Sequence, residues 1–344
     1  MEQRPSKTRT QNLISVVAPA FNEAETLPEF MGRVQSSLEG LAYELIIVDD
    51  GSADGTLQIL KQAAAGDPRV KVIGLSRNFG HQAAITAGLD NASGDVVVMM
   101  DADLQDPPEL IPEMLTRWAE GADVVFAVRR SREGETRAKL TTARWFYKLF
   151  GKLAQIELTP QAGDFRLFDR RALAALNSMR ERNRFLRGMS VWVGFEQAAV
   201  EYDRDERFAG ETKYTPRKML RFSFDAIASF SHLPLQFATI LGFVFSVVAF
   251  LAIPVAIGFR IAGEFVPGVT TVLLVVLLLG GIQLITVGII GEYLGRVYEE
   301  VKGRPLYVVR ETSNFGDVGV VEPSQEEAAS PASPYESGET GAGS

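Results

Sequence analysis

The stretch VVVMMDADLQD, residues 96–106, joins five apolar residues directly to a cluster of carboxylates. A short, continuous run of valine and methionine is typical of a strand that is buried on both faces of a parallel sheet. In open α/β sheets, ligands bind outside the carboxyl ends of the strands. Residues 96–106 therefore predict a buried strand that ends at a ligand site.

The same pattern recurs on both sides of this stretch. Further apolar runs rich in Val and Ile occupy residues 13–18, 45–48, 70–75 and 124–128. Helical patterns lie between the runs, and the first has apolar residues at helical spacing: Leu27, Phe30, Met31, Val34 and Leu38. Asn22 with Glu25 three residues later predicts a capping box at its start. This alternation predicts an α/β fold with an open, mostly parallel, doubly wound sheet.

Polar clusters follow the first four predicted strands. They are PAFNE at 19–23, DDGS at 49–52, SRNFGH at 76–81 and DADLQD at 101–106. Turn residues normally follow strands, so no single cluster is diagnostic, but four clusters on one edge predict a site. The sequence has neither a G-x-x-x-x-G-K-[ST] loop nor a G-x-G-x-x-G pattern after a strand. The site is therefore expected to use side-chain carboxylates.

Asp101 and Asp103 are the candidate metal ligands in this cluster. They are two positions apart at a strand end, so the pleat is expected to direct both side chains the same way. With Gln105 they offer the oxygen ligands that suit Mg²⁺ or Mn²⁺ bridging to a diphosphate. The alternative is a turn of capping aspartates, and Asp106 is expected to cap the next helix. The metal is favoured because the apolar run makes Asp101 nearly buried, and an unpaired buried carboxylate is costly.

The composition excludes several classes of chemistry. The chain has 344 residues, no cysteine and two histidines, His81 and His232. The absence of cysteine excludes a disulfide scaffold, a zinc-thiolate site and a cysteine nucleophile. Two histidines argue against a histidine metal cluster or a Ser-His-Asp triad. We interpret His81 as a helix cap or packing residue and His232 as a residue at a membrane boundary.

Two uncharged segments predict membrane spans. Residues 233–259 and 265–291 are each 27 residues long and contain no charged side chain. About 20 residues suffice to cross a bilayer, and two buried helices of a soluble core are the disfavoured alternative. Basic residues gather before the first span and after the second, whereas the connecting loop 260–264 holds one. The positive-inside rule places both flanks in the cytoplasm.

The remaining segments complete the predicted organisation. Residues 216–231 form an amphipathic helix that either packs on the N-terminal domain or, as we favour, lies in the headgroup plane. Residues 1–11 are a polar, basic arm, expected to be disordered and unlike a secretory signal. Seven acidic residues and no basic residue follow Arg310 in a tail rich in Ser, Pro, Gly and Ala. We expect this tail, 311–344, to be disordered and to carry most of the net charge of −8.

Seven motifs together resemble the family 2 glycosyltransferases. They are PAFNE, VDDGS, SRNFGHQAA, DADLQDPPE, GDFR at 163–166, NRFLRG at 183–188 and AGETKY at 209–214. The resemblance covers residues 12–310 and is strongest to the polyprenyl-phosphate branch, which includes bactoprenol glucosyltransferases and relatives of dolichol-phosphate mannose synthase. It implies a cytoplasmic GT-A domain at 12–215, a two-helix membrane hairpin at 232–292 and a cytoplasmic segment at 293–310. The protein is expected to be integral to the cytoplasmic membrane, with both termini inside.

The resemblance also implies roles for individual residues. Those expected around the nucleotide sugar are Pro19, Phe21, Glu23, Asp50, Arg77 and Asp101, with Asp50 accepting from the base. Those expected around the metal are Asp101, Asp103 and Gln105. Those expected to meet phosphates of donor or lipid are Arg129, Arg132, Arg207 and Lys213, with solvated surface charges as an equally weighted alternative. Asp164 matches an acidic position near the acceptor, where it serves the reaction or only orients Arg166 or the sugar.

The predicted reaction is an inverting, metal-dependent transfer of a hexose from a nucleotide sugar to a polyprenyl phosphate. Undecaprenyl phosphate, UDP-glucose and glucose follow from the resemblance, and mannose, galactose and aminosugars stay open. The alternatives are a processive polysaccharide synthase, although the Q-x-x-R-W motif of those enzymes is absent, and a non-enzymatic nucleotide-binding membrane protein. Close-approach glycines on the second span leave homo-oligomerisation open. No nucleic-acid partner is expected.

Overall fold

The computed structural model describes most of the chain. The described residues are 9, 11–130, 162–202, 233–262 and 268–315, although some side chains of the two long helices are left out. Three predicted phosphate-binding residues, Arg132, Arg207 and Lys213, lie outside the described residues, as does the predicted interfacial helix 216–231.

One eight-stranded sheet, in the order β7-β5-β6-β4-β1-β2-β3-β8, forms the centre of the N-terminal domain. The strands are β1 (Ile14–Ala20), β2 (Tyr43–Asp49), β3 (Val70–Leu75), β4 (Val96–Met99), β5 (Val124–Arg129), β6 (Ala162–Asp169), β7 (Gln197–Tyr202) and β8 (Val309–Ser313). In the described part of the chain, only β6 and β8 run against the other strands. The predicted, mostly parallel sheet is confirmed.

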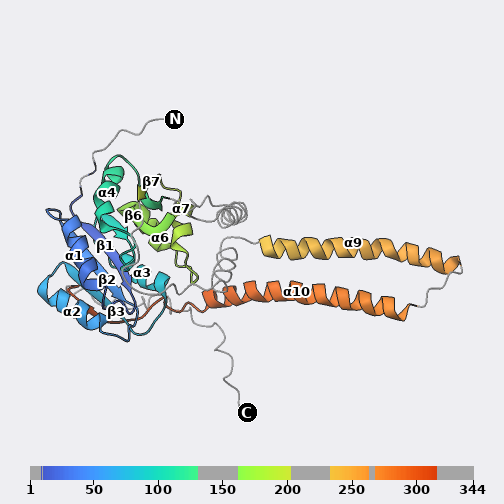
Figure 1. The fold of residues 1–344 in the computed structure, drawn as a ribbon. Coiled ribbons are helices and arrows are strands. Elements are labelled where there is room, and N and C mark those ends of the chain that lie inside the picture. Colours follow the sequence, from blue (N-terminus) through green and yellow to red (C-terminus); the bar gives the residue numbers. More distant parts are fainter. Residues whose placement is uncertain (1–8, 10, 131–161, 203–232, 263–267, 316–344) are drawn as a thin grey trace, which may run out of the picture.

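Helices cover both faces of this sheet (Figure 1). One face packs against α1 (Leu27–Ser37), α2 (Thr56–Gly66) and α4 (Ile111–Ala119), which follows a 3₁₀ turn, η1 (Pro108–Leu110). The other face packs against α3 (His81–Asp90), α6 (Arg170–Ser178) and α7 (Leu186–Trp192). Successive residues of β1 divide between the two cores, since Val16 packs in the first and Val17 in the second. The sheet is therefore doubly wound, as predicted.

Two predicted helix caps are wrong. Helix α1 begins only at Leu27, and Asn22 lies in a left-handed conformation with φ 56°. The Asn22 side chain instead accepts a hydrogen bond from the backbone N–H of Ala53, so it joins two loops. Asp106 caps nothing, because η1 begins after Pro107 and the Asp106 carboxylate is engaged by Arg129. Both side chains are used for contacts between elements that are distant in sequence.

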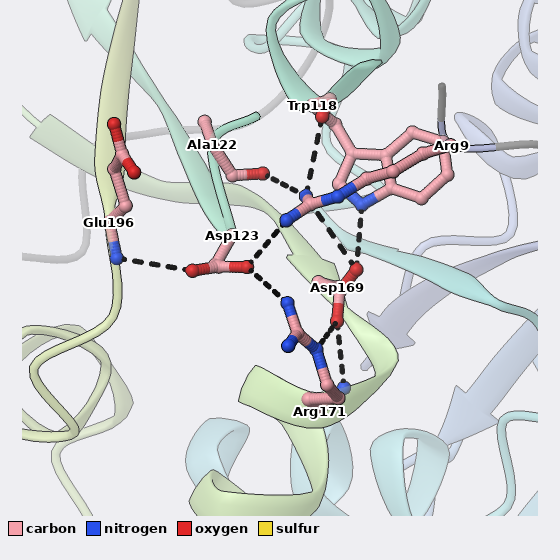
Figure 2. A network of polar contacts seen from close by, with 7 residues as sticks. All are labelled: Arg9, Trp118, Ala122, Asp123, Asp169, Arg171 and Glu196. Carbon is pink, nitrogen blue, oxygen red and sulfur yellow. Dashed lines mark hydrogen bonds and ion pairs between the residues drawn. The ribbon is translucent and has the colours of Figure 1, made fainter. Parts of the chain in front are cut away.

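Arg9, within the arm predicted to be disordered, is docked onto the domain (Figure 2). Its guanidinium donates to the carboxylate of Asp123 at 2.8 Å and to the carbonyl of Ala122 at 2.7 Å, and it lies 3.7 Å from Asp169. It also lies 5.6 Å from the centre of the Trp118 ring. Asp123 and Asp169 are 6% and 8% exposed, and two buried carboxylates need a cation. Arg9 supplies such a cation, so this residue of the predicted arm is bound to the domain.

Two long helices, α9 (Leu233–Ile261) and α10 (Val269–Val301), extend away from the α/β domain side by side (Figure 1). After α10 the chain returns to the sheet, and β8 adds to the edge strand β3 in antiparallel pairing. Glu311 to Ser313 therefore belong to a strand, so the acidic tail starts later than the predicted residue 311. The sequence VRETS of β8 is polar because it forms an exposed sheet edge.

Residues 233–259, the first segment predicted to span the membrane, are helical, and so are residues 269–291 of the second. Among the described residues, one stretch is long and apolar enough to cross a bilayer: Leu278–Val301 in α10, with a mean hydropathy of 1.5. No part of its apolar window is buried inside the protein. This stretch begins and ends later than the predicted span 265–291. Crossing by α9 stays a prediction.

Candidate active site

The polar clusters meet at one rim of the sheet because of strand direction. The strands β1 to β4 all end there, and so do β5 and β7, which run the same way. Strand β6 runs in the opposite direction, so it begins at this rim. Met99 of β4 pairs with Arg166 of β6, and beyond this pair Asp101 and Asp164 lie close enough for their charges to interact. Two carboxylates that are 63 residues apart in sequence are therefore neighbours.

His81 lies between these two carboxylates. Its Nε2 atom is 3.4 Å from Asp101 Oδ1 and 3.7 Å from Asp164 Oδ2. Burial lowers the pKa of His81, but the two carboxylates outweigh burial and raise it above its ordinary value. His81 is the first residue of α3 and makes no capping hydrogen bond, so its interpretation as a helix cap is wrong, and its side chain faces two carboxylates instead. The sequence signal for this location was its place in the polar cluster directly after the third predicted strand.

Asp164 is held on its other side by Arg187 of α7. The Arg187 guanidinium donates to Asp164 Oδ1 from Nε at 3.2 Å and from Nη2 at 3.1 Å. Burial disfavours the charged form of Asp164, but His81 and Arg187 outweigh it and hold its pKa well below the usual range. Nearby Arg166 is 2% exposed and donates to the Ser190 hydroxyl, and burial lowers its pKa to about 9. Asp164 is thus a fixed anion.

The candidate metal ligands form a loop rather than a strand end. Strand β4 stops at Met99, and Leu104 takes a left-handed conformation with φ 60°. The pleat argument for Asp101 and Asp103 is therefore wrong, although their charges do interact. Asp103 Oδ1 accepts the backbone N–H of Gln105 at 3.1 Å. The loop conformation, not the strand, brings these side chains together.

Two oxygens of this loop are enclosed without a hydrogen bond: Asp101 Oδ1, which only faces His81, and Gln105 Oε1. Burial raises the pKa of Asp101 to about 6, against the opposing effect of His81. The Asp101 side chain as a whole is 33% exposed, so the prediction that it is nearly buried is wrong, although its Oδ1 atom is enclosed. Among the described residues, no group of three or more His, Cys, Asp or Glu is arranged to hold a metal ion. Two enclosed oxygens still fit a hard cation that takes its remaining ligands from a phosphate.

The loops after β1, β2 and β3 are tied into one wall of the site. The Asn22 backbone N–H donates to the Ser52 hydroxyl at 2.9 Å, which joins the first two loops. Asp50 joins the second and third, because its carboxylate accepts the N–H of Phe79 at 2.7 Å and of Gly80 at 2.9 Å. Burial raises the pKa of Asp50 against the effect of these two bonds. Asp50 thus fixes the backbone directly before His81.

The other residues predicted at the nucleotide lie on or beside this wall. Pro19 is buried within β1, and Phe21 is 42% exposed at its end. Glu23 accepts from the Thr26 hydroxyl at 2.9 Å. Arg77 is exposed, with its guanidinium carbon 4.2 Å from the centre of the Phe79 ring. No described contact joins these side chains to Asp101, so a shared nucleotide site stays a prediction.

Arg129, at the carboxyl end of β5, is the described member of the predicted phosphate-binding set. Its Nε donates to the Tyr202 hydroxyl at 2.9 Å, and its Nη2 lies 3.4 Å from Asp106 Oδ1. Asp106 belongs to the loop of the candidate metal ligands. Sequence reasoning missed Tyr202 because nothing in QAAVEY distinguishes its last residue from an ordinary strand tyrosine.

Comparisons with known proteins identify the family of this chain. The model of the family "Glycosyl transferase family 2" matches residues 15–176. The uncharacterized glycosyltransferase YkcC of Bacillus subtilis is 46% identical over 87% of this chain and 93% of its own. The prophage bactoprenol glucosyl transferase homolog of Escherichia coli is 42% identical over 86% and 98%.

A structure of glucosyl-3-phosphoglycerate synthase from Mycobacterium tuberculosis with Mn²⁺, UDP and phosphoglyceric acid aligns with a TM-score of 0.44. It is 22% identical and covers 63% of this chain and 76% of that chain, a similarity too remote to assign a function. The curated relatives named bactoprenol glucosyl transferase, by contrast, share 40–42% identity with this chain along most of their length. The chain therefore belongs to glycosyl transferase family 2 and is a glycosyltransferase.

Proposed function

We propose that this enzyme transfers glucose from UDP-glucose to the phosphate of undecaprenyl phosphate, with inversion, at the cytoplasmic face of the membrane. One observation carries the proposal: a family 2 site of fixed carboxylates belongs to a chain whose helix α10 is apolar and unburied. Relatives named bactoprenol glucosyl transferase, 40–42% identical over most of the chain, support the acceptor and the sugar.

The candidate metal ligands in this reaction are Asp101, Asp103 and Gln105. Their oxygens suit Mg²⁺ or Mn²⁺, and the enclosed, unbonded oxygens of Asp101 and Gln105 support a cation there. Such a cation would supply positive charge that stabilises the leaving diphosphate. His81 lies between Asp101 and Asp164, and when it is protonated its charge offsets the repulsion between the two carboxylates. Arg187 holds Asp164 in place, so this carboxylate can orient the sugar or the acceptor.

The acceptor needs no general base. A phosphate monoester has a second pKa near 6, so at neutral pH it is already largely dianionic. The protein's task is then electrostatic, because two anionic substrates must approach each other. Arg129 supports this role, and Arg132, Arg207 and Lys213 are the further candidates for the lipid phosphate. Activity should therefore fall as the pH drops through about 6.

The test is transfer of radiolabel from UDP-glucose in membranes that contain the protein. Label should enter an organic extract and be released by mild acid, which cleaves a glycosyl phosphate but spares an ordinary glycoside. Membranes without the protein are the control for background transfer. Acid-stable product would show that a hydroxyl is the acceptor, polymer at the origin would indicate a processive synthase, and no transfer with any nucleotide sugar would contradict the proposal.

A further inference from the structure

Arg129 is held by Tyr202 and Asp106, which come from two other elements. We call this set of three residues the Arg129 mount. Arg129 ends β5 and Tyr202 ends β7, and the two residues are directly paired in the parallel register. Asp106 comes from the loop that also carries Asp101, Asp103 and Gln105. The three side chains therefore connect the sheet to the loop of candidate metal ligands.

Hydrogen bonds in this mount have one direction. Arg129 Nε donates to the Tyr202 oxygen at 2.9 Å, and the Tyr202 hydroxyl donates to Asp106 Oδ1. Burial and the neighbouring Asp106 raise the pKa of Tyr202 far above its ordinary value, so the hydroxyl keeps its proton. Arg129 Nη2 faces the same Asp106 oxygen at 3.4 Å. Nε and Nη2, the inner edge of the guanidinium, are thus both engaged.

The outer edge of the guanidinium is left for a ligand. Arginine has five N–H donors in a planar fork, and the mount uses one on Nε and one on Nη2. The remaining three point away from Tyr202, and none bonds to another described residue. A Cβ added at Gly163 would lie 3.5 Å from Nη2, so glycine at this position leaves space beside that atom. The planar fork matches a phosphate in a bidentate manner.

The residues that hold Arg129 are buried, whereas the Arg129 side chain itself is partly exposed. Asp106 and Tyr202 are 1% and 5% exposed, whereas the Arg129 side chain is 30% exposed. A buried carboxylate needs a positive partner, and the guanidinium of Arg129 neutralises Asp106. The same ion pair holds the guanidinium in place.

We propose that Asp106 and Tyr202 are positioning residues, which orient the guanidinium of Arg129 so that its outer edge binds a phosphate group of one substrate. This inference rests on the proposed function in that both substrates carry phosphate: the donor a diphosphate, the acceptor a monoester. Tyr202 touches neither substrate and acts through Arg129.

The test measures binding by the full-length protein in detergent, with two separate probes. One is UDP with Mn²⁺, and the other is a short-chain polyprenyl phosphate. Arg129→Gln should weaken one probe by about 10- to 100-fold, the range for losing charged hydrogen bonds. Tyr202→Phe should weaken the same probe by about 3- to 10-fold. The affected probe identifies which phosphate Arg129 binds.

A double-variant cycle separates positioning from general damage. If Tyr202 acts through Arg129, Tyr202→Phe should have no further effect on binding once Arg129→Gln is present. Arg129→Lys keeps the charge but loses the Nε donor, and it leaves the Tyr202–Asp106 bond intact. It should therefore weaken the same probe as Tyr202→Phe, without lowering the melting temperature. Arg130→Gln, at the neighbouring exposed pair with Glu201, is the matched control and should bind both probes normally.

The outcomes distinguish this inference from the proposed function. If the Tyr202→Phe and Arg129→Gln effects on binding are non-additive, as expected, but the native enzyme transfers no glucose, the proposed function is contradicted and the positioning role is supported. If the native enzyme transfers glucose and the Tyr202→Phe and Arg129→Lys variants bind both probes normally, the positioning role of Tyr202 and Asp106 is overturned and the proposed function stands. Additive effects of Tyr202→Phe and Arg129→Gln would also overturn the positioning role, as would failure of the native protein to bind either probe.

Discussion

Asp103 is the residue whose charge the proposed chemistry needs most clearly. Asp103→Asn keeps the size of the side chain and an oxygen that can accept from Gln105 N–H, but it removes a charged ligand. We expect transfer to fall on the order of 100-fold, as when one group that stabilises transition-state charge is removed. The measurement is the transfer rate over a series of Mn²⁺ concentrations, with Glu113→Gln on the surface of α4 as the charge-matched control. A normal rate at every Mn²⁺ concentration would refute the metal assignment.

Glu44 is a buried carboxylate outside the site that serves stability. It is 3% exposed and accepts from the Ser15 hydroxyl, from Ser93 N–H at 2.6 Å and from Lys71 Nζ at 2.7 Å. Burial acts to raise the pKa of Glu44, but these three donors outweigh it and lower the pKa below 4.5. The charged form therefore stabilises the fold above the ordinary pKa, and this contribution is lost as pH falls through the lower, folded-state value.

Glu44→Gln should consequently lower the free energy of unfolding by about 1–3 kcal/mol at pH 7, because a neutral amide cannot satisfy the same three donors. The difference between the native protein and the variant should shrink as the pH is lowered below about 4.5. Thermal unfolding of the full-length protein in detergent between pH 7 and 4 measures both effects. A difference that grows on acidification would mean that the sign of the pKa shift is wrong.

At the scale of elements, close contact between the loops after β2 and β3 depends on Gly51. It has φ +69°, and a Cβ there would lie 2.6 Å from the carbonyl carbon of Arg77 and 2.8 Å from Asn78 N. Gly40 has a similar φ of +79° with nothing within 4 Å. Both alanine variants pay about 1 kcal/mol for the left-handed conformation, but only Gly51→Ala displaces the loop that leads to His81.

Gly51→Ala should therefore weaken UDP binding by about tenfold or more, since small displacements of positioned groups are costly, whereas Gly40→Ala should not change it. Calorimetric titration of UDP onto the two variants checks this prediction. Equal affinities in the two variants would show that the loop contact has no part in nucleotide binding, whatever its effect on stability.

The elements that the sequence predicted are those with continuous apolar runs. The strands β1 to β5 could be identified because both of their faces are buried, which selects Val and Ile without interruption. Strand β6 was missed because the charged residues Asp164 and Arg166 interrupt its apolar pattern. Strand β8 was missed because an exposed edge strand has no apolar signature.

The candidate site was also predictable only in part: residues adjacent in sequence could be recognised, but contacts between distant residues could not. Asp101, Asp103 and Gln105 could be recognised together because they are adjacent in sequence. The contacts of His81 with Asp164 and of Arg129 with Tyr202 join residues 83 and 73 positions apart. Such contacts depend on the strand order β7-β5-β6-β4, which periodicity and turn residues do not encode.

At the scale of the whole molecule, the α/β domain is fastened to the end of α10. Glu300 in its last turn accepts the backbone N–H of Arg182 at 2.7 Å, and the Tyr307 hydroxyl donates to Asp90 at 2.8 Å. The chain then pairs with β3, whose following loop lines the site wall. These contacts fix the domain to α10, so a membrane that holds α10 also sets the distance from the bilayer to the site.

The orientation of this assembly is the remaining prediction, and the absence of cysteine makes it directly measurable. Basic residues flank both long helices on the domain side, so the domain should face the cytoplasm and the connection between α9 and α10 the outside. Single cysteines at Gln35, exposed on α1, and at Ala262, exposed just after α9, report the two sides. A membrane-impermeant maleimide added to intact cells should label Ala262→Cys, and should label Gln35→Cys only after the cells are opened.

The cysteine-free native chain controls for background labelling. Labelling of Gln35→Cys in intact cells would reverse the orientation. Protection of Ala262→Cys in intact cells would mean that the connection between α9 and α10 does not reach the outside, so the two helices would not cross the membrane.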